Sequence, residues 1–518
     1  MRSVLSSVVV SGLVMGCSVF GAGESSSGQA PPPGTPQDNA QPPPVDGTPI
    51  PGVYVSTSQG SDEGTGTPAR PLKTLKKAFA LANEQHLRVI ACAEVYEESV
   101  TLIDGVSAYG YYECAATPWK KGDRRAIVRA PTSPAVLAKG LRLPTRVEGF
   151  EIIAPDLDGA GATETTGSSI ALEVRDSREL VFSGSRLHAG RGAPGADGVA
   201  GPPNTLGGSD APPGKSQRVS DCPVGAACIN VKVIGPPGAV TTCAIGPPGG
   251  PGGQGGDGRF LIDCNPNTNA TELRGRPLVA NVSTAVGGLY SGGKGLPGAI
   301  GTAGTDGVDG VNGTWSFSEK GFVRGSGTAG GRGEPGQGGG GGGGTDGWFT
   351  GGGFACPSPP TPYADTATGG GGGAGGCAGQ PGTSATGGGA SIGALVVGSG
   401  VTIEGTRLES SAGGRAGLGN LGGKGTFGGK PGAASNTATG SGGPGGPGGN
   451  GGASGHGAAG PSIALAYAGT RPLLTGQDLA PGEGGAGQPE LRGNTPLGRL
   501  KFLPAAAPGS SEAEHEIK

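Results

Sequence analysis

The stretch Ser169-Ile170-Ala171-Leu172, followed by Phe182-Ser183-Gly184-Ser185-Arg186-Leu187, decides the fold because the chain repeats it. The further copies are Ser391-Ile392-Gly393-Ala394-Leu395 with Ile403-Glu404-Gly405-Thr406-Arg407-Leu408, and Ser462-Ile463-Ala464-Leu465 with Leu474-Thr475-Gly476-Gln477-Asp478-Leu479. The second half of each copy places a glycine between two apolar residues, which predicts a strand, a tight bend and another strand. One copy cannot bury its apolar face alone, so the copies must stack as a solenoid.

Glycine-rich tracts interrupt this solenoid, and they begin at the same point of each copy, after Leu187, Leu408 and Leu479. We therefore expect them to leave from one corner of successive rungs. The tracts are 189–220, 235–258, 286–345, 350–389 and 411–460.

Within the tracts glycine often recurs at every third residue, without interruption from Gly292 to Gly313. Three structures are open: a collagen triple helix, a bundle of polyproline-II-like segments packed through glycine, and long mobile loops. The collagen-like runs are short and broken. Because glycine loses much conformational entropy on ordering, we expect mobile loops.

The region after residue 52 starts the body of the protein. Val53-Tyr54-Val55-Ser56 reads as a strand, and Leu72, Leu75, Phe79 and Ala82 lie at helical spacing. Together with Gly60, Asp62, Gly64-Thr65, Pro71-Leu72-Lys73-Thr74-Leu75 and Ala78, this region resembles the start of a pectin-lyase-like, right-handed parallel β-helix. The resemblance implies an all-β fold in which a helix at 72–83 caps the open N-terminal end.

The first residues are typical of an export signal. Arg2 precedes an apolar stretch, Val4–Val14, that is too short to span a bilayer. Leu13-Val14-Met15-Gly16-Cys17 resembles the lipobox of bacterial lipoproteins, which implies lipid attachment at Cys17 and removal of residues 1–16. An ordinary signal peptide cut nearby, for instance after Ala22, is the alternative. Ser18 in place of aspartate favours the outer membrane.

Eight cysteines remain of the nine when Cys17 is set aside, an even number that suits an oxidising compartment. Their spacing predicts local disulfides, with free thiols or zinc ligation as alternatives; no CxxC pair supports zinc. The predicted pairs are Cys92–Cys114, Cys222–Cys228, Cys243–Cys264 and Cys356–Cys377.

Few residues suggest a catalytic or metal-binding site. His86, His188, His456 and His515 have no common spacing, and we expect His456 and His515 to be exposed. Pectin-lyase-like enzymes use clustered acids with a basic residue, and the nearest candidates are Asp156 with Asp158, and Arg175, Asp176 and Arg178. The latter group is better explained as a solvated turn. No cofactor or metal motif is complete, and a net charge of −3 without a basic block gives no support for nucleic-acid binding.

The sequence predicts these segments: signal peptide 1–16, Pro/Ser/Gly-rich tether 17–52, capped β-helix rungs 53–190, glycine-rich insertions with short strands and disulfides 191–390, a rung 391–410, a glycine-rich insertion 411–460, C-terminal rungs 461–503 and a disordered tail 504–518. We expect a non-catalytic lipoprotein, anchored in the bacterial cell envelope or at its surface, that displays its glycine-rich loops. Its partners would be a membrane, through the lipid, and surface glycans or other surface proteins. The alternative is a β-helix that binds or cleaves polysaccharide. Ice or mineral binding by flat glycine-rich strands is a third option.

Overall fold

The computed structural model describes residues 50–115, 118–159, 162–163, 165–218, 230–262, 290–291, 294–318, 321–344, 346–349, 365–494 and 500–518. They all belong to one compact unit, Asn39–Lys518. The signal segment, Cys17 and most of the predicted tether lie outside the described residues.

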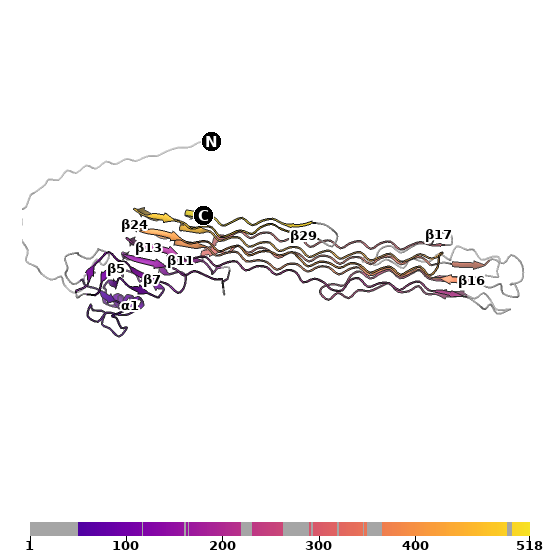
Figure 1. The fold of residues 1–518 in the computed structure, drawn as a ribbon, viewed down its shortest axis with the longest axis horizontal. Coiled ribbons are helices and arrows are strands. Elements are labelled where there is room, and N and C mark those ends of the chain that lie inside the picture. The colour runs from indigo at the N-terminus through magenta and orange to yellow at the C-terminus, as the bar shows by residue number, and fades with distance from the viewer. Residues whose placement is uncertain are drawn as a thin grey trace, which may run out of the picture. The chain divides into compact units, whose positions relative to one another are not determined.

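The body is a stack of parallel strands in three sheets, as expected for a parallel β-helix-like, all-β fold. Figure 1 shows the stacked strands beside the single helix of the described residues. The first sheet contains β1 (Val53–Val55), β2 (Val89–Cys92), β5 (Ala108–Glu113), β9 (Thr145–Glu148), β12 (Leu180–Ser183), β24 (Val401–Glu404) and β27 (Leu473–Thr475), with β6 (Lys120–Lys121) antiparallel to β5. The second contains β3 (Val95–Tyr96), β7 (Ala126–Arg129), β10 (Phe150–Ile153), β13 (Arg186–Ala189), β25 (Arg407–Ser410) and β28 (Asp478–Ala480). The third contains β4 (Val100–Thr101), β8 (Val136–Lys139), β11 (Ser169–Arg175), β23 (Ser391–Val397), β26 (Ser462–Ala468) and β31 (Ser511–Ile517).

The repeats lie in register, as predicted. Phe182 pairs with Ile403, and Leu187 pairs with Leu408, so equivalent positions of successive copies stack. The bend between first and second sheet falls at Gly184, Gly405 and Gly476, whose φ angles are 55°, 50° and 60°. These left-handed values explain the glycine, because a Cβ there would be strained.

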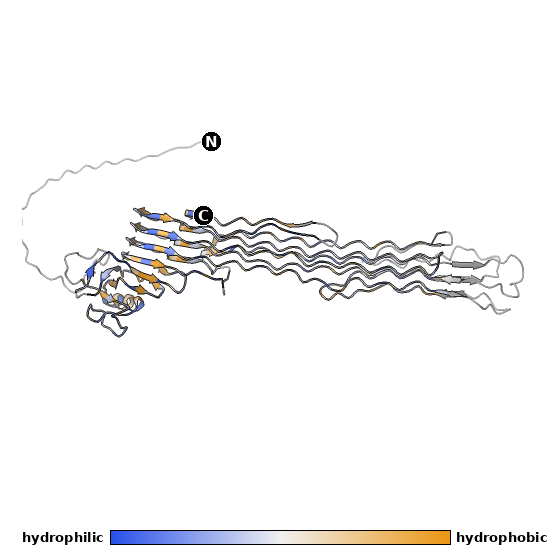
Figure 2. Cartoon of the chain, in the orientation of Figure 1, coloured by the Kyte–Doolittle hydropathy of each residue, from blue (hydrophilic) through white to orange (hydrophobic). Residues whose placement is uncertain are grey.

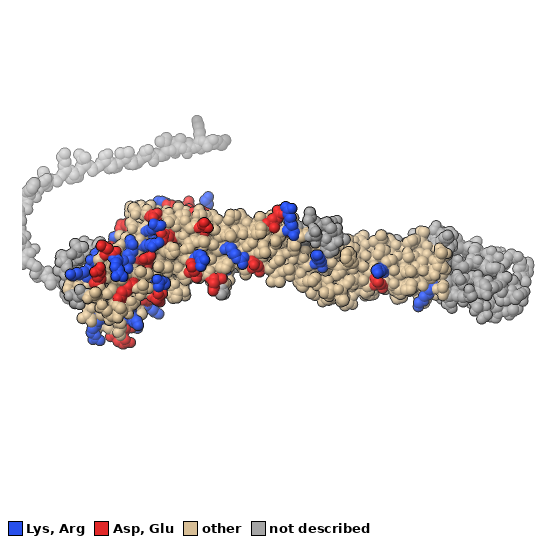
Figure 3. Space-filling model, viewed as in Figure 1, with Lys and Arg blue, Asp and Glu red and all other residues tan. Residues whose placement is uncertain are grey.

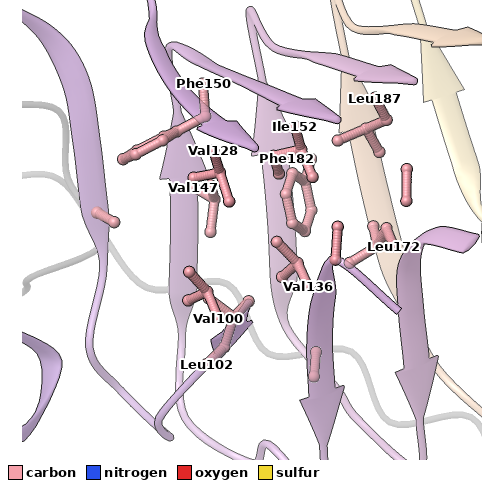
Figure 4. Packing of buried hydrophobic residues seen from close by; sticks show 14 of the residues in the cluster. Val100, Leu102, Val128, Val136, Val147, Phe150, Ile152, Leu172, Phe182 and Leu187 are labelled. Atoms are coloured by element: carbon pink, nitrogen blue, oxygen red, sulfur yellow. The ribbon is translucent and has the colours of Figure 1, made fainter. Parts of the chain in front are cut away.

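The core is the column of apolar side chains enclosed by the three sheets. Figure 4 shows Val128, Val147, Phe182 and Leu187 pointing inward from different strands toward one another. Figure 2 shows apolar residues concentrated on the stacked strands and the helix. Strands from distant repeats therefore share one hydrophobic cluster, which is what holds the rungs together.

The capping helix α1 spans Leu75–Gln85 and begins three residues later than predicted. Leu72 instead bridges to Val55, next to the first strand. The helix starts where its N–H groups find acceptors: Thr74 accepts from Lys77 N–H, and the Glu98 carboxylate accepts from the N–H groups of Leu75 (2.7 Å) and Lys76 (3.0 Å). It ends at His86, a left-handed C-cap, rather than at Asn83. Leu75, Phe79 and Ala82 of the predicted apolar face are buried in the helix together with Ala78, whereas Leu72 lies before its first turn.

Three glycine-rich excursions leave the β-helix at one corner, after strands β13, β25 and β28 of the second sheet, and return to β23, β26 and β31 of the third. A serine begins each returning strand and donates its hydroxyl to a carbonyl at the departing corner. The pairs are Ser391 to Gly190, Ser462 to Ser411 and Ser511 to Gly482, each 2.7 Å apart. The repeated serine thus fastens the point where each excursion starts.

The prediction of mobile loops is wrong. Hydrogen bonds join the excursions to one another at intervals of three residues, for example from the N–H groups of Gly298, Gly301 and Gly304 to the carbonyls of Ser441, Pro444 and Pro447 (all 2.9 Å). Figure 1 shows these segments running side by side. Three residues per turn is the period of polyproline II, so the segments form a polyproline-II-like bundle, here called the glycine bundle. The entropic cost of ordering the glycines is outweighed by these hydrogen bonds, because each glycine lets two backbones approach closely enough to form one.

Short strands lie within the excursions. They are β14 (Ser216–Arg218) with β22 (Asp365–Ala367), β15 (Asn230–Val233) with β16 (Gly258–Ile262) and β21 (Asp346–Phe349), β17 (Tyr290–Ser291) with β18 (Lys294–Gly295), β19 (Ser316–Ser318) with β20 (Gly321–Val323), and β29 (Leu491–Asn494) with β30 (Leu500–Leu503).

The C-terminal tail also corrects a prediction. Residues 504–518 were expected to be disordered, but Ser511–Ile517 form β31, which pairs in parallel with β26. Its polarity suggested a solvated tail, whereas its register makes it the last strand of the third sheet.

Candidate functional site: the glycine bundle

The centre of the bundle is the segment 369–376, in which every residue but Ala374 is glycine. Its successive N–H groups donate to different neighbours. Gly370, Gly371 and Gly372 donate to the carbonyls of Gly440 (3.0 Å), Pro212 (3.2 Å) and Gly253 (2.8 Å). A helix with three residues per turn points successive groups in three directions, so a fully surrounded segment bonds on every side.

Close approach rather than backbone freedom explains these glycines. A Cβ added to Gly372 would lie 2.0 Å from the carbonyl oxygen of Gly339. A Cβ on Gly370 would lie equally close, 2.0 Å, to the carbonyl of Gly432. No side chain larger than hydrogen fits at these positions unless the neighbouring backbone moves.

Outer segments need glycine only where they face a neighbour. Along 294–313 every third residue is glycine, and these glycines donate to the segment 438–456. The residue after each glycine is exposed instead, including Leu296, Thr305, Val308 and Val311. The spacing of glycine in the sequence therefore reports how many neighbours a segment has.

Proline marks positions where the bundle has no acceptor for an N–H. Gly301 and Gly304 bond to the carbonyls of Pro444 and Pro447, whose missing N–H groups need no partner. The residues that precede these glycines, Ile300 and Ala303, carry no hydrogen-bonding side chain.

Further along the segment 438–456, where proline is absent, side chains of the neighbouring segment accept from the backbone N–H groups. At the next three equivalent positions the segment 294–313 carries Asp306, Asp309 and Asn312. Their Oδ1 atoms accept from the backbone N–H groups of Asn450 (2.7 Å), Ala453 (2.6 Å) and His456 (2.9 Å). At these three positions the N–H that proline would remove meets a side-chain oxygen instead, which avoids the cost of an unbonded backbone donor.

Threonine has the same role elsewhere in the bundle. The hydroxyls of Thr328, Thr383 and Thr386 accept from the N–H groups of Val311 (2.8 Å), Val199 (2.7 Å) and Ala196 (2.7 Å). On the same segment, Asp197 accepts from Leu418 N–H and pairs with Arg415 at 2.9 Å. These hydrogen bonds from Arg415 and Leu418 hold the pKa of the Asp197 carboxyl below its usual value.

His456 lies inside the bundle, which corrects the expectation that it is exposed. Its Nδ1 accepts from Gly419 N–H at 2.9 Å. Burial lowers the pKa of the imidazole, and the Pro489 carbonyl opposes this. His515 is also partly covered: it contacts Trp315 and Phe317 and pairs with Glu512 at 2.7 Å.

Two disulfides are present among the described cysteines. Cys92–Cys114 joins strand β2 to the end of β5, as predicted. Cys243 is bonded to Cys377, so the predicted pairs Cys243–Cys264 and Cys356–Cys377 are wrong. The bundle brings two segments 134 residues apart into contact. This contact, rather than nearness in the sequence, determines which cysteines pair. Cys222, Cys228, Cys264 and Cys356 lie outside the described residues.

The surface of the bundle differs from that of the β-helix. Figure 3 shows Lys, Arg, Asp and Glu gathered over the stacked strands and sparse along the bundle on this face. Uncharged side chains stand exposed on the bundle: Val199 (66%), Ile300 (69%), Val308 (80%), Val311 (69%) and Phe427 (67%). We call Leu296, Ala299, Thr302, Thr305, Val308 and Val311, the exposed residues that each follow a glycine, the 296–311 ridge.

The acids and bases proposed for polysaccharide chemistry are not assembled into one cluster. Asp156 pairs with Arg191 at 3.1 Å and accepts from its backbone N–H, and these contacts lower the pKa of the carboxyl. Arg175 pairs with Glu173 on β11, whereas Asp176 adopts a left-handed φ of 48° at the end of that strand.

The densest charge network of the described residues lies on the outward side of the second sheet, and sequence reasoning did not identify it. The Glu409 carboxylate is bonded to Arg186 (2.6 Å), His188 (3.2 Å) and Arg407. Burial raises the pKa of Glu409, but these cations outweigh it and hold the pKa below its usual value. Glu409 therefore stays ionised, which suits a cross-rung ion pair rather than a proton donor.

Within the described residues, Cys92, Glu94 and Cys114 are the one group of three possible metal ligands, and the two sulfurs are bonded to each other. Glu94 accepts instead from Ser56, Thr57 and Ser58, and so fastens the turn after β1.

No described helix combines the length and apolarity needed to cross a membrane. Comparison of the chain with protein-family models, curated proteins and solved structures finds no match.

Proposed function

We propose that the protein is a non-catalytic, exported surface protein whose β-helix carries the glycine bundle as a stiff adhesive module. The observation that carries the proposal is the bundle itself. Its backbone groups bond to neighbours on several sides, while uncharged side chains project from its surface. A bonded backbone keeps such side chains at fixed spacing, which a mobile loop cannot do.

The charge distribution supports contact through the bundle rather than through the β-helix. On the described rungs acidic and basic side chains are paired with one another, as Glu409 is with Arg186 and Arg407. By contrast the six side chains of the 296–311 ridge are uncharged, and Asp306 and Asp309 between them bond to backbone N–H groups of the neighbouring segment. Apolar side chains exposed in a row are a common mark of a binding surface.

The tether belongs to the same proposal. Leu13-Val14-Met15-Gly16-Cys17 and the proline-rich stretch up to residue 52 support a lipid at Cys17 and a spacer that holds the body away from the outer membrane. The two disulfides suit an oxidising compartment outside the cytosol. We also propose that the rungs form a right-handed, pectin-lyase-like helix, on the strength of the Asp62, Gly64 and Leu72–Leu75 pattern.

Polysaccharide binding or cleavage by the β-helix is the second candidate, and the notable observation in its favour is the parallel-stranded scaffold itself. Fold alone does not supply an activity. The ion pairs of Asp156 and Glu409 are those expected of structural charges.

Adhesion of whole cells tests the proposal. Cells displaying the full chain should be retained on an apolar surface, and the Val308→Ser/Val311→Ser variant should be retained several-fold less, because the ridge loses its most exposed apolar groups. Thr302→Ser/Thr305→Ser is the matched control and should behave like the original chain. Equal retention of both variants at equal surface display would contradict the adhesive role.

A second experiment tests the lipid anchor. A Cys17→Ser variant that still takes up labelled fatty acid would contradict the attachment at Cys17.

A further inference from the structure

The last strand, β31, is a modified copy of the repeat that builds the third sheet. Ser511-Glu512-Ala513-Glu514 lies in register with Ser462-Ile463-Ala464-Leu465 of β26. The serine and the alanine are kept, and Ser511 makes the same corner hydrogen bond as Ser391 and Ser462. The two large apolar residues are replaced by glutamate. The common serine and alanine are the sequence signal that identifies this strand as a repeat.

Glu514 falls where the main core would continue, and so does Glu516, two residues further along the strand. Register relates Leu172 to Ala394, Leu465 and Glu514 in one column. A second column runs from Val174 through Val396 and Tyr467 to Glu516. The members of both columns up to Leu465 and Tyr467 belong to, or pack against, the hydrophobic core. Two inward-facing columns therefore end in carboxylates.

The edge beyond β31 needs such protection. Among the described strands, β31 pairs with β26 and with no other, so its far side presents backbone donors and acceptors. It is seven residues long, whereas β27 and β28, the last strands of the other two sheets, have three residues each. Leu474 and Leu479 of those strands are only partly buried. A long free edge next to exposed apolar groups is a template for another chain.

Two glutamates of β31 already form ion pairs at this end. Arg471 makes two bonds to Glu514, at 3.0 and 2.7 Å, and Glu512 pairs with His515 at 2.7 Å. A further rung stacked on β31 would cover Glu514 and Glu516 and remove them from water. Such burial is unfavourable unless the incoming chain supplies matching cations.

We infer that β31 is an edge guard: its inward-facing glutamates keep a second copy of this chain from stacking onto the C-terminal end of the β-helix. This inference does not depend on the adhesive role of the bundle. The partner excluded is a second copy, because it would present the same unpaired strands with the same spacing between sheets.

The test restores the apolar columns in the full chain with the Glu514→Leu/Glu516→Val variant. Sedimentation velocity should show the original chain as a monomer and the variant as a dimer in a concentration-dependent equilibrium. The control is Glu84→Leu/Asp123→Val, which makes the same change of charge and apolarity at exposed positions elsewhere and should remain monomeric. To locate the contact, Leu473→Cys in the variant background should form dimers with a flexible bis-maleimide, and Asp123→Cys should not.

A folded Glu514→Leu/Glu516→Val variant that remains monomeric at all concentrations overturns the inference. The inference is also overturned if Leu473→Cys alone, with Glu514 and Glu516 unchanged, is cross-linked into dimers. If the double variant does not fold, a chain ending at Gly509 exposes β26 directly, with Leu465 and Tyr467 at the edge. Dimers cross-linked through Leu473→Cys then support the guard, and monomers overturn it.

Discussion

Asp309 and Ala453 are joined by a hydrogen bond in which the Asp309 carboxylate oxygen accepts from the Ala453 backbone N–H at 2.6 Å. The same relationship links Asp306 to Asn450 and Asn312 to His456. Three side chains spaced three residues apart thus bond to three N–H groups with the same spacing. In a bundle with little apolar material, satisfied backbone donors replace part of what a hydrophobic core supplies elsewhere.

Removing that acceptor should weaken the bundle. Asp309→Ala leaves the Ala453 N–H without its partner, at a cost of about 1–3 kcal/mol. Asp309→Asn keeps an oxygen in place and should be nearly neutral. Hydrogen exchange by mass spectrometry checks this: amides of 450–456 should exchange faster in Asp309→Ala alone. Unchanged exchange would show that the contact is not stabilising.

A methyl group at the centre of the bundle should disrupt it. In Gly372→Ala the new Cβ would lie 2.0 Å from the Gly339 carbonyl, so the segments must separate. We expect at least the 1–3 kcal/mol typical of an overpacked core. Gly400→Ala is the control, because a Cβ there meets no atom within 4 Å. Thermal unfolding followed by circular dichroism compares the two, and similar melting temperatures would refute the close packing.

The stability of the bundle should fall in mild acid because of His456. Burial lowers the pKa of this imidazole in the folded chain. Between the lowered value and the ordinary value of about 6.5, the unfolded chain binds more protons, so stability rises with pH. The contribution is complete above pH 6.5 and is lost as the pH falls toward the lowered pKa. Denaturant unfolding at several pH values checks this, and His456→Gln should flatten that part of the profile. An unchanged slope in the variant would assign the effect to other groups.

The disulfide between Cys243 and Cys377 should be found by peptide mapping without reductant, as one cross-linked peptide pair. Mapping that instead joins Cys243 to Cys264 would contradict the bundle topology. Cys243→Ser/Cys377→Ser should lower the free energy of unfolding by roughly 2–5 kcal/mol, because the bond closes a long loop. The Cys92→Ser/Cys114→Ser variant is the comparison, with a loop of 22 residues rather than 134.

The sequence by itself determined the rungs and the position of the excursions. Apolar residues around Gly184, Gly405 and Gly476 predict strand, bend and strand, because alternating burial and a left-handed bend are local requirements. It also located the helix and its buried face. Its first turn was misplaced, since the Glu98 carboxylate that receives those N–H groups comes from a later segment.

Only the tertiary structure decided what the glycine tracts do. Spacing alone left collagen, bundle and loop open, because a glycine at every third residue suits any chain that approaches a neighbour on one side. Contacts between distant segments show that the tracts form the bundle, that Cys243 pairs with Cys377 and that His456 is buried. The same holds for β31, whose glutamates read as a solvated tail until the register with β26 places them at the end of the core. Backbone bonding between segments is non-local and leaves no apolar pattern, so a single sequence does not reveal its partners.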